Sequence, residues 1–312
     1  MTLLVLRALG LGDLMTAFPA LRGLARAFPR HRLVLAAPRA LAPLAMLSGA
    51  VDEVLDAAPL MPLAWSAPVD VAVNLHGRGP ESHRVLQALA PARLIAFAHP
   101  AIPESAGGPA WRADEHEVAR WCRLLREHGI EADPTLLDLE VPPGPVPREA
   151  HGATLIHPGA AHAARRWPAD RWVAVARAER ARGRRVILTG GRDERVLARA
   201  IAAQAGLPER TVYAGETDVV GLARLVAAAG RVVCGDTGIA HLATALRVPS
   251  VVLFGPTAPA RWGPPPDRRW HRVLWAGTTG APNGTRVDAG LLRIRPETVT
   301  AALDELTLET AA

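Results

Sequence analysis

Lysine is absent from this chain of 312 residues, and aromatic residues make up only 4% of it. All 36 basic side chains are therefore arginines, which give a formal net charge of +6 against 30 acidic residues. A basic balance favours anionic partners. The arginines are scattered, however, and aromatic side chains are too few to form platforms for base stacking. We therefore expect no nucleic-acid partner.

Several catalytic motifs are also missing from the sequence. Without lysine there is no Gly-x-x-x-x-Gly-Lys loop, which excludes a P-loop nucleotide hydrolase. No Asp-x-Asp pair occurs, so the common divalent-metal site for a nucleotide diphosphate has no support. Zinc spacing of His and Cys and the Gly-x-Ser-x-Gly elbow are absent too. We predict no metal ion and no cofactor.

Only two cysteines are present, Cys122 and Cys234. They fall inside a predicted helix and a predicted strand, where we expect buried free thiols. The apolar run Leu3–Leu6 is too short for the core of a signal peptide, and prolines and an arginine interrupt the apolar residues 33–50. These features predict a soluble, cytoplasmic protein. The positive charge leaves peripheral contact with the anionic inner face of the cell membrane open.

Strand and helix signals alternate along both halves of the chain, which predicts parallel sheets covered by helices on both faces. The proline-rich stretch Pro142–Pro147 is typical of a stiff linker. We therefore predict an α/β protein of two doubly wound domains, residues 1–145 and 146–312, whose facing carboxyl edges form a cleft. Residues 277–290 show little pattern. A final helix is expected over 296–306, with the N-terminal domain as a candidate packing partner.

The stretch Gly235–Ala243 gives the strongest indication of chemistry. It follows a short apolar run typical of a buried parallel strand, and a second turn, Gly255–Pro259, follows the next such run. Both turns should lie at the carboxyl ends of adjacent strands, where open α/β sheets bind ligands. A helix starting near Ile239 would offer free N–H groups and a positive dipole to a phosphate. Thr237 and His241 add side-chain donors, so we predict a phosphorylated ligand.

Two more glycine turns follow predicted strands in the C-terminal half. His157-Pro158-Gly159 precedes a loop with Arg165 and Arg166. These two are either solvated surface charges or a second anion site, because guanidinium groups suit bidentate phosphate contacts. Thr189-Gly190-Gly191 precedes Glu194, which either binds ribose hydroxyls or is an ordinary first-turn acid favoured by the helix dipole.

The N-terminal half has two comparable turns. In Gly10-Leu11-Gly12-Asp13 the glycines allow a sharp turn, but the third glycine of a dinucleotide-binding motif is missing. Asp13 either caps the following helix or accepts a proton from a hydroxyl. His76-Gly77-Arg78 ends another strand. It either lines this half of the cleft or holds a partly buried structural histidine.

Together these blocks resemble the bacterial heptosyltransferase family, glycosyltransferase family 9, over most of the chain. The resemblance rests on Arg7–Asp13 with Phe18–Leu21, His157–Gly159 with Arg165–Pro168, Asp236–Gly238 with His241–Ala243, and Phe254–Thr257. It implies a GT-B fold of two Rossmann-like domains, the N-terminal one binding an acceptor and the C-terminal one a nucleotide sugar. It also implies metal-independent, inverting transfer, typically from ADP-heptose to a lipopolysaccharide core, within cell-envelope glycan biosynthesis. We expect a monomer whose partners are the nucleotide sugar and a glycan or glycolipid acceptor.

The resemblance also implies roles for individual residues. Asp13 is similar to the general base of the family, and Arg165 stands where the family usually has a lysine on the donor diphosphate. The remaining donor-binding candidates are Thr189, Gly190, Glu194, Asp236, Thr237, Gly238 and His241. The acceptor-side candidates are Gly12, His76 and Arg78. Two alternatives stay open: a nucleotide-sugar enzyme of the 2-epimerase type, which needs no acceptor, and a non-catalytic protein that binds nucleotide sugars.

Overall fold

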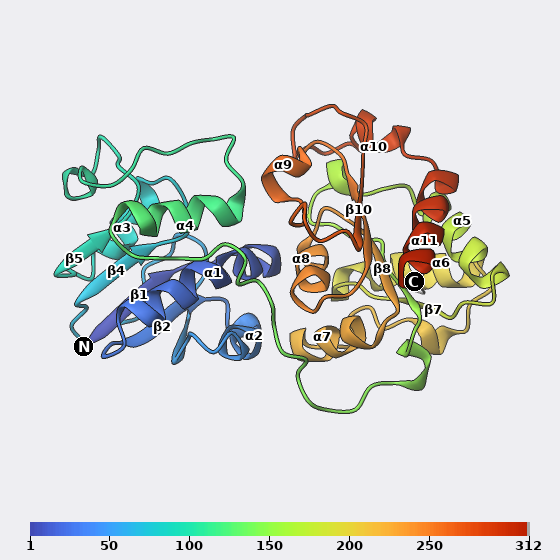
Figure 1. The fold of residues 1–312 in the computed structure, drawn as a ribbon, viewed down its shortest axis with the longest axis horizontal. Coiled ribbons are helices and arrows are strands. Elements are labelled where there is room, and N and C mark those ends of the chain that lie inside the picture. The colour runs from blue at the N-terminus through green and yellow to red at the C-terminus, as the bar shows by residue number, and fades with distance from the viewer. Residues whose placement is uncertain (311–312) are drawn as a thin grey trace. The chain divides into compact units, whose positions relative to one another are not determined.

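The computed structural model describes residues 1–310, with side chains through residue 306. The chain divides into two compact units, Met1–Leu139 and Glu140–Ala312 (Figure 1). The division falls just before the proline-rich stretch Pro142–Pro147. Each unit is built on one five-stranded sheet whose strand pairs are all parallel. The predicted fold class, two doubly wound α/β domains, is confirmed.

The N-terminal unit has the strand order β3-β2-β1-β4-β5. The chain thus winds outward from β1, returns, and winds outward again from β4. The neighbours β1 and β4 flank the topological switch point, the place where open α/β sheets leave a crevice for ligands. The strands are β1 Thr2–Leu6, β2 Arg32–Ala37, β3 Glu53–Asp56, β4 Val71–Asn74 and β5 Arg93–Ile95; the helices are α1 Leu11–Ala27, α2 Ala42–Leu47, α3 Glu81–Gln87 and α4 Glu117–Glu127.

Helix α1 begins at Leu11, with Gly10 as its N-cap residue. The sequence-based interpretation of Asp13 as the N-cap is therefore wrong, because Asp13 lies at the third helical position. From there its carboxylate reaches back to accept a hydrogen bond from the Gly10 N–H over 3.2 Å. Helical spacing in α1 buries Leu14, Phe18 and other apolar side chains under the sheet, as the sequence predicts.

The C-terminal unit has the strand order β10-β9-β8-β6-β7, with its switch point between β6 and β8. In Figure 1, α7 and α8 lie on one side of this sheet and α5, α6 and α11 on the other. The strands are β6 Thr154–His157, β7 Val186–Leu188, β8 Arg231–Gly235, β9 Ser250–Phe254 and β10 His271–Trp275; the helices are α5 Ala169–Ala181, α6 Arg195–Gln204, α7 Val219–Ala228, α8 Gly238–Ala245, α9 Pro259–Trp262, α10 Ala289–Arg293 and α11 Pro296–Thr310.

The edge strand β10 is a feature that the sequence pattern does not indicate, because its residues HRVLW lack a continuous apolar run. In the structure His271 is buried, and the four residues after it alternate between half-buried and exposed. In the final helix α11, the side chains of Val299, Leu303 and Leu306 join the core of the C-terminal unit, where α11 packs on α5 and β9.

The cysteine prediction is confirmed, since Cys122 in α4 and Cys234 in β8 are buried free thiols. Among the helices that the structure describes, none is both long and apolar enough to cross a membrane.

Candidate functional site

A buried arginine organises the switch point of the N-terminal unit. Arg7 directly follows β1 and is 1% exposed. Its Nε donates to the main-chain oxygen of Asp13 over 3.0 Å, and its Nη1 donates to the main-chain oxygen of Leu75, which follows β4. Its Nη2 lies near three acceptors: Glu117 Oε1 at 3.0 Å, Thr16 Oγ1 at 3.2 Å and Asp13 Oδ1 at 3.3 Å. Arg7 therefore ties β1, α1, β4 and α4 together beside Asp13.

Glu117 enters this cluster from the first turn of α4 and is 5% exposed. Its Oε1 accepts from both Arg7 and the indole Nε1 of Trp121, the latter over 2.9 Å. Its Oε2 accepts from Arg120, one helical turn on. The Arg7 guanidinium also stacks 4.8 Å from the Trp121 ring centroid. Both carboxylate oxygens of Glu117 are thus satisfied inside the protein.

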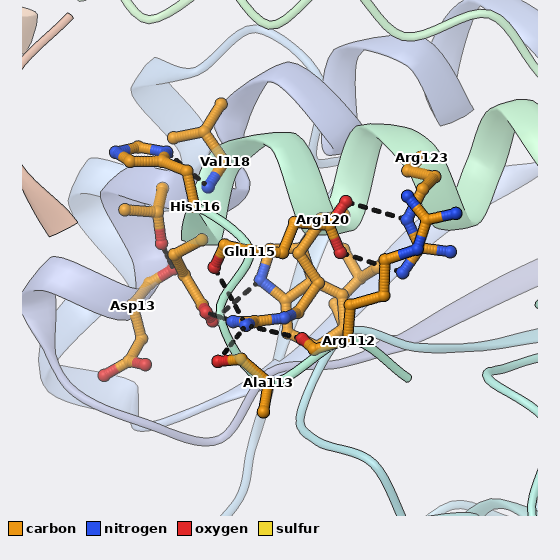
Figure 2. A network of polar contacts seen from close by, with 12 residues as sticks. Asp13, Arg112, Ala113, Glu115, His116, Val118, Arg120 and Arg123 are labelled. Atoms are coloured by element: carbon orange, nitrogen blue, oxygen red, sulfur yellow. Dashed lines mark hydrogen bonds and ion pairs between the residues drawn. The ribbon is translucent and has the colours of Figure 1, made fainter. Parts of the chain in front are cut away.

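The loop before α4 is held by the same helix. Arg120 Nη2 donates to three main-chain oxygens of that loop, those of Arg112, Ala113 and Glu115 (Figure 2). Arg123 holds the Glu115 carboxylate at 2.7 and 2.8 Å. In Figure 2 the Asp13 carboxylate points away from this loop and its arginines. The arginines of α4 therefore hold the loop, and the Asp13 carboxylate instead contacts Arg7 and the Gly10 N–H.

The Asp13 side chain is partly buried, with 28% of its surface exposed to solvent. Burial is the largest influence and raises the pKa of the carboxyl above its usual value. The Arg7 guanidinium opposes this rise, and the negative charge of Glu117 adds to it. A carboxylate with a raised pKa that still reaches solvent is suited to take a proton from a hydroxyl.

The acceptor-side candidates lie around the same switch point. His76 follows β4 and is half-buried, and burial together with the nearby Arg7 charge lowers its pKa to about 4. Its ring is therefore neutral at physiological pH. Gly12 lies in the first turn of α1 and is half-buried, and Arg78 is exposed. Gly12 and Asp13 in the first turn of α1 and His76 after β4 thus follow the two neighbouring strands β1 and β4, and Arg78 lies at the surface.

The turn carrying His76 is fixed by a buried asparagine. Asn74 Oδ1 accepts from the His76 N–H over 2.9 Å, and Nδ2 donates to Ser82 Oγ over 2.9 Å. The same Nδ2 lies 3.1 Å from His83 Nδ1, and His83 Nε2 lies 2.8 Å from the Phe97 carbonyl oxygen. Because a carbonyl only accepts, Nε2 carries the proton and Nδ1 accepts from Asn74. His83 is thus a neutral structural histidine.

In the C-terminal unit, the turns after β6 and β7 meet at Glu194. The Glu194 Oε2 atom accepts from the Gly191 N–H over 2.7 Å and lies 3.8 Å from His157 Nε2. His157 Nδ1 in turn lies 3.0 Å from the hydroxyl of the buried Thr189. A Cβ on Gly159 would stand 1.9 Å from Glu194 Oε1, so Gly159 makes room for this carboxylate. Glu194 is therefore an acid of the first helical turn after β7, with its carboxylate against the turn after β6.

Gly190 serves the same turn, because a Cβ there would lie 3.1 Å from Glu194 Cβ and 3.3 Å from Ala214 Cβ. The glycines that follow β6 and β7 thus bring main chain and the Glu194 side chain close together.

The loop after β6 also meets the turn after β8. Arg165 Nη1 donates to the main-chain oxygen of Asp236 over 3.2 Å, while its buried Nε has no hydrogen-bond partner among the residues that the structure describes. Asp236 is 6% exposed. Burial raises the pKa of its carboxyl to about 6, against the opposing influences of Arg165 and of a hydrogen bond from Thr257. The prediction that the turns after β8 and β9 lie at the ends of adjacent strands is confirmed. A hydrogen bond between Asp236 and Thr257 joins the two turns.

Helix α8 begins at Gly238, with Thr237 as its N-cap residue in extended conformation. The Thr237 side chain caps no N–H of the helix, and its hydroxyl lies 3.3 Å from the Gly235 carbonyl oxygen. His241, on the first turn, packs edge-on against Trp262 of α9 at 5.8 Å between ring centroids. The N–H groups of the first turn of α8, the Thr237 hydroxyl and the His241 imidazole thus lie at one sheet edge, and groups of these kinds suit an anionic ligand.

A model of one protein family matches residues 110–285, more than half of the chain, and that family is glycosyltransferase family 9 (heptosyltransferase). The chain belongs to glycosyltransferase family 9. The match begins before α4 and ends before α10, so it includes Glu117, Arg165 and the Asp236–His241 turn.

Two curated heptosyltransferases are similar to this chain over part of their length. Lipopolysaccharide heptosyltransferase 1 of Pseudomonas aeruginosa is 37% identical over 114 residues, 36% of this chain and 29% of the relative. Lipooligosaccharide heptosyltransferase 2 of Haemophilus ducreyi is 30% identical over 139 residues, 42% of this chain and 36% of the relative. The aligned segments thus span about a third of these relatives.

Solved structures are similar over nearly the whole chain. ADP-heptose lipopolysaccharide heptosyltransferase II of E. coli superposes with a TM-score of 0.77 at 21% identity and covers 100% of both chains. A glycosyltransferase family 9 protein from Veillonella parvula gives 0.80 at 19% identity, covering 99% of this chain and 97% of the other. E. coli heptosyltransferase WaaC with ADP gives 0.71 at 19%, covering 98% and 100%. At these identities the likeness shows the fold alone.

Sequence reasoning missed two residues near the candidate site. Glu117 lies more than a hundred residues from Arg7 in the sequence and is hidden inside an ordinary amphipathic helix. Trp262 lies in the short helix α9, which no sequence pattern indicates. In the sequence, Glu117 is marked only as an acidic residue near the start of a helix, and its burial becomes visible in the structure alone.

Proposed function

We propose that this family 9 protein transfers a sugar, a heptose, from an ADP-linked donor to a hydroxyl of a glycan or glycolipid acceptor. The reaction is metal-independent and inverts the anomeric centre. Family membership and the two curated heptosyltransferases support the transfer of heptose. The observation that carries the proposal is Asp13, a partly exposed carboxylate of raised pKa at a sheet switch point.

The proposed reaction is a single displacement. Asp13 takes the proton of the acceptor hydroxyl as its oxygen attacks the anomeric carbon and the bond to the diphosphate breaks. Arg165 and the first turn of α8 stabilise the negative charge that develops on the departing diphosphate, so positive protein groups supply what a metal ion would supply. One displacement at the anomeric carbon inverts its configuration.

Each unit supplies one half of this reaction. The N-terminal unit binds the acceptor through the surroundings of Gly12, His76 and Arg78. The C-terminal unit binds the donor, with the diphosphate at Arg165 and the start of α8, and the ribose near Glu194. The remaining donor contacts are Thr189, Gly190, Asp236, Thr237, Gly238 and His241. On this proposal the enzyme is a cytoplasmic monomer that works at the inner face of the membrane, in cell-envelope glycan synthesis.

A thermal-shift screen with ADP, GDP, UDP and dTDP tests the donor class. Because a ligand that binds the folded state alone stabilises it, ADP should raise the melting temperature more than the other nucleotides at equal concentration. A larger effect of another nucleotide would overturn the ADP assignment.

An Asp13→Asn variant tests the reaction. Transfer from ADP-heptose to a heptose-free lipopolysaccharide core should fall by about 100-fold or more, the range for loss of a general base, while calorimetric ADP affinity stays unchanged. Undiminished transfer would sink the role of Asp13. Conversion of the donor without any acceptor would instead point to an epimerase, and ADP binding with no turnover of any kind to a binding protein.

A further inference from the structure

The Nη2 group of Arg7 has more acceptors than protons. It carries two N–H bonds, yet Glu117 Oε1, Thr16 Oγ1 and Asp13 Oδ1 all lie within 3.0 to 3.3 Å of it. Glu117 is the nearest of the three, and Asp13 is the farthest. Two carboxylates therefore compete for one buried guanidinium group, and Asp13 has the weaker contact.

The Glu117 side chain is held in place beside Arg7. Trp121 Nε1 and Arg120 hold its two oxygens, and both residues belong to the same helix α4. Its side chain is 7% exposed, so it has little access to a substrate. A group so placed acts on a reaction only through its neighbours.

We propose that Glu117 is a positioning residue that keeps Asp13 a strong base by drawing the Arg7 guanidinium away from it. This inference rests on the proposed role of Asp13 in proton transfer. Without the Glu117 charge, Arg7 would pair with Asp13 alone, and a carboxylate in a full ion pair is a poor proton acceptor.

Among the charged groups around Asp13, Arg7 and Glu117 are the two that influence the pKa of its carboxyl. Arg7 directly follows β1. Glu117 and Arg120 belong to α4, and the Arg120 guanidinium is engaged by Glu117 and by the loop before α4. The end of β4 contributes His76, which is neutral because its pKa is lowered to about 4. The influences on the pKa of Asp13 agree with this balance, since Glu117 raises it and Arg7 lowers it.

Titration of Asp13 in the full-length Glu117→Gln variant tests the inference without turnover. With aspartate labelled at the carboxyl carbon with carbon-13, the Asp13 signal is assigned by its absence in Asp13→Asn and followed by NMR against pH. We expect the midpoint to move toward acid by about 1 pH unit, as befits a carboxylate left alone with an arginine. The matched control is Glu115→Gln, which removes a carboxylate from Arg123 and should leave the midpoint unchanged.

An unchanged midpoint in folded Glu117→Gln would overturn the inference, as would an equal shift in the control. If Glu117→Gln does not fold, Glu117→Asp serves instead. This variant keeps the negative charge but shortens the side chain by one methylene, so the carboxylate lies farther from Arg7. We expect the Asp13 midpoint to move toward acid by a smaller amount. An unchanged midpoint would again overturn the inference.

The pH profile of transfer separates the role of Glu117 from that of Asp13 itself. In Glu117→Gln the acid limb of kcat/KM should move by the same amount as the NMR midpoint. A purely structural role for Glu117 would lower the yield of folded enzyme and leave the limb in place. Full transfer activity of Asp13→Asn would refute the proposed role of Asp13 as the base. If Asp13→Asn is inactive but the Asp13 midpoint does not move in Glu117→Gln, only the positioning role of Glu117 is refuted.

Discussion

Arg165 donates a hydrogen bond from Nη1 to the main-chain oxygen of Asp236 over 3.2 Å. The two residues come from the connections after β6 and β8, the strands that flank the switch point of the C-terminal unit. The contact sets the guanidinium beside the start of α8, where Thr237 and Gly238 begin the helix. A fixed cation and a helix N-terminus thus lie side by side at one sheet edge, an arrangement suited to a diphosphate.

Arg165→Ala should weaken ADP binding by about 10- to 100-fold, because hydrogen bonds to a charged group contribute roughly 1.5–3 kcal/mol. Isothermal titration calorimetry measures this change. Arg166→Ala is the matched control, since the exposed Arg166 donates to the main-chain oxygens of Ala160 and Ala161 and not to the Asp236 turn. Equal losses in both variants would mean that general positive charge, not the Arg165 position, holds the nucleotide.

Gly159→Ala should displace the Glu194 carboxylate, because the new Cβ would stand 1.9 Å from its Oε1. Glu194 can swing away, but it then loses its bond to the Gly191 N–H. We expect the free energy of unfolding to fall by about 1–2 kcal/mol and ADP affinity to fall with it. Urea unfolding of the C-terminal unit, followed by the fluorescence of its tryptophans, reports the first change, and calorimetry reports the second.

Gly191→Ala is the control for this prediction. Its Cβ would lie 3.6 Å from Glu194 Oε2, an ordinary contact, and its φ of −67° suits alanine. Its stability should stay within about 0.5 kcal/mol of the parent protein. Tolerance of alanine at both positions would show that the close approach of Glu194 to residue 159 is unimportant.

Asp236→Asn should stabilise the protein at neutral pH and not at pH 4. Burial raises the pKa of Asp236 from 3.8 to about 6, so between these values the folded protein keeps a proton that the unfolded chain has lost. The free energy of unfolding therefore falls as pH rises through this window. Asparagine resembles the protonated form of aspartate. The free energy of unfolding of Asp236→Asn should therefore exceed that of the parent protein by an amount that grows from pH 4 to about 6 and levels off on the order of 2–3 kcal/mol. Denaturant melts across pH 4–8 measure it; an advantage independent of pH would show that burial of the Asp236 charge is not its cause.

Asn74→Ala should lower the free energy of unfolding of the N-terminal unit by about 2–3 kcal/mol, since it leaves buried partners unsatisfied at His83 and Ser82. Gln87→Ala removes a solvent-exposed amide that contacts Glu104 over 2.7 Å, and its effect should stay below about 0.5 kcal/mol. Urea unfolding compares the two. A loss no larger than that of Gln87→Ala would show that Asn74 is not the hub of the His76 turn.

The sequence alone determined the two α/β units and the placement of the turns. Continuous apolar runs such as Leu3–Leu6 predict strands buried on both faces, and they are fully buried. The order of glycine turns after strands was enough to predict that the Asp236 turn and its neighbour after β9 share one sheet edge. Local pattern succeeds here because strand burial and turn chemistry depend on adjacent residues.

Only the tertiary structure decided what surrounds the reactive groups. The position of Asp13 at the third residue of α1 followed from the extended backbone at Gly10, and the edge strand β10 and the packing of α11 followed from the core that they complete. Above all, Glu117 meets Arg7 across 110 positions of sequence. The charge balance at Asp13 arises from this long-range contact in a buried, weakly screened setting, and no local pattern encodes such a contact.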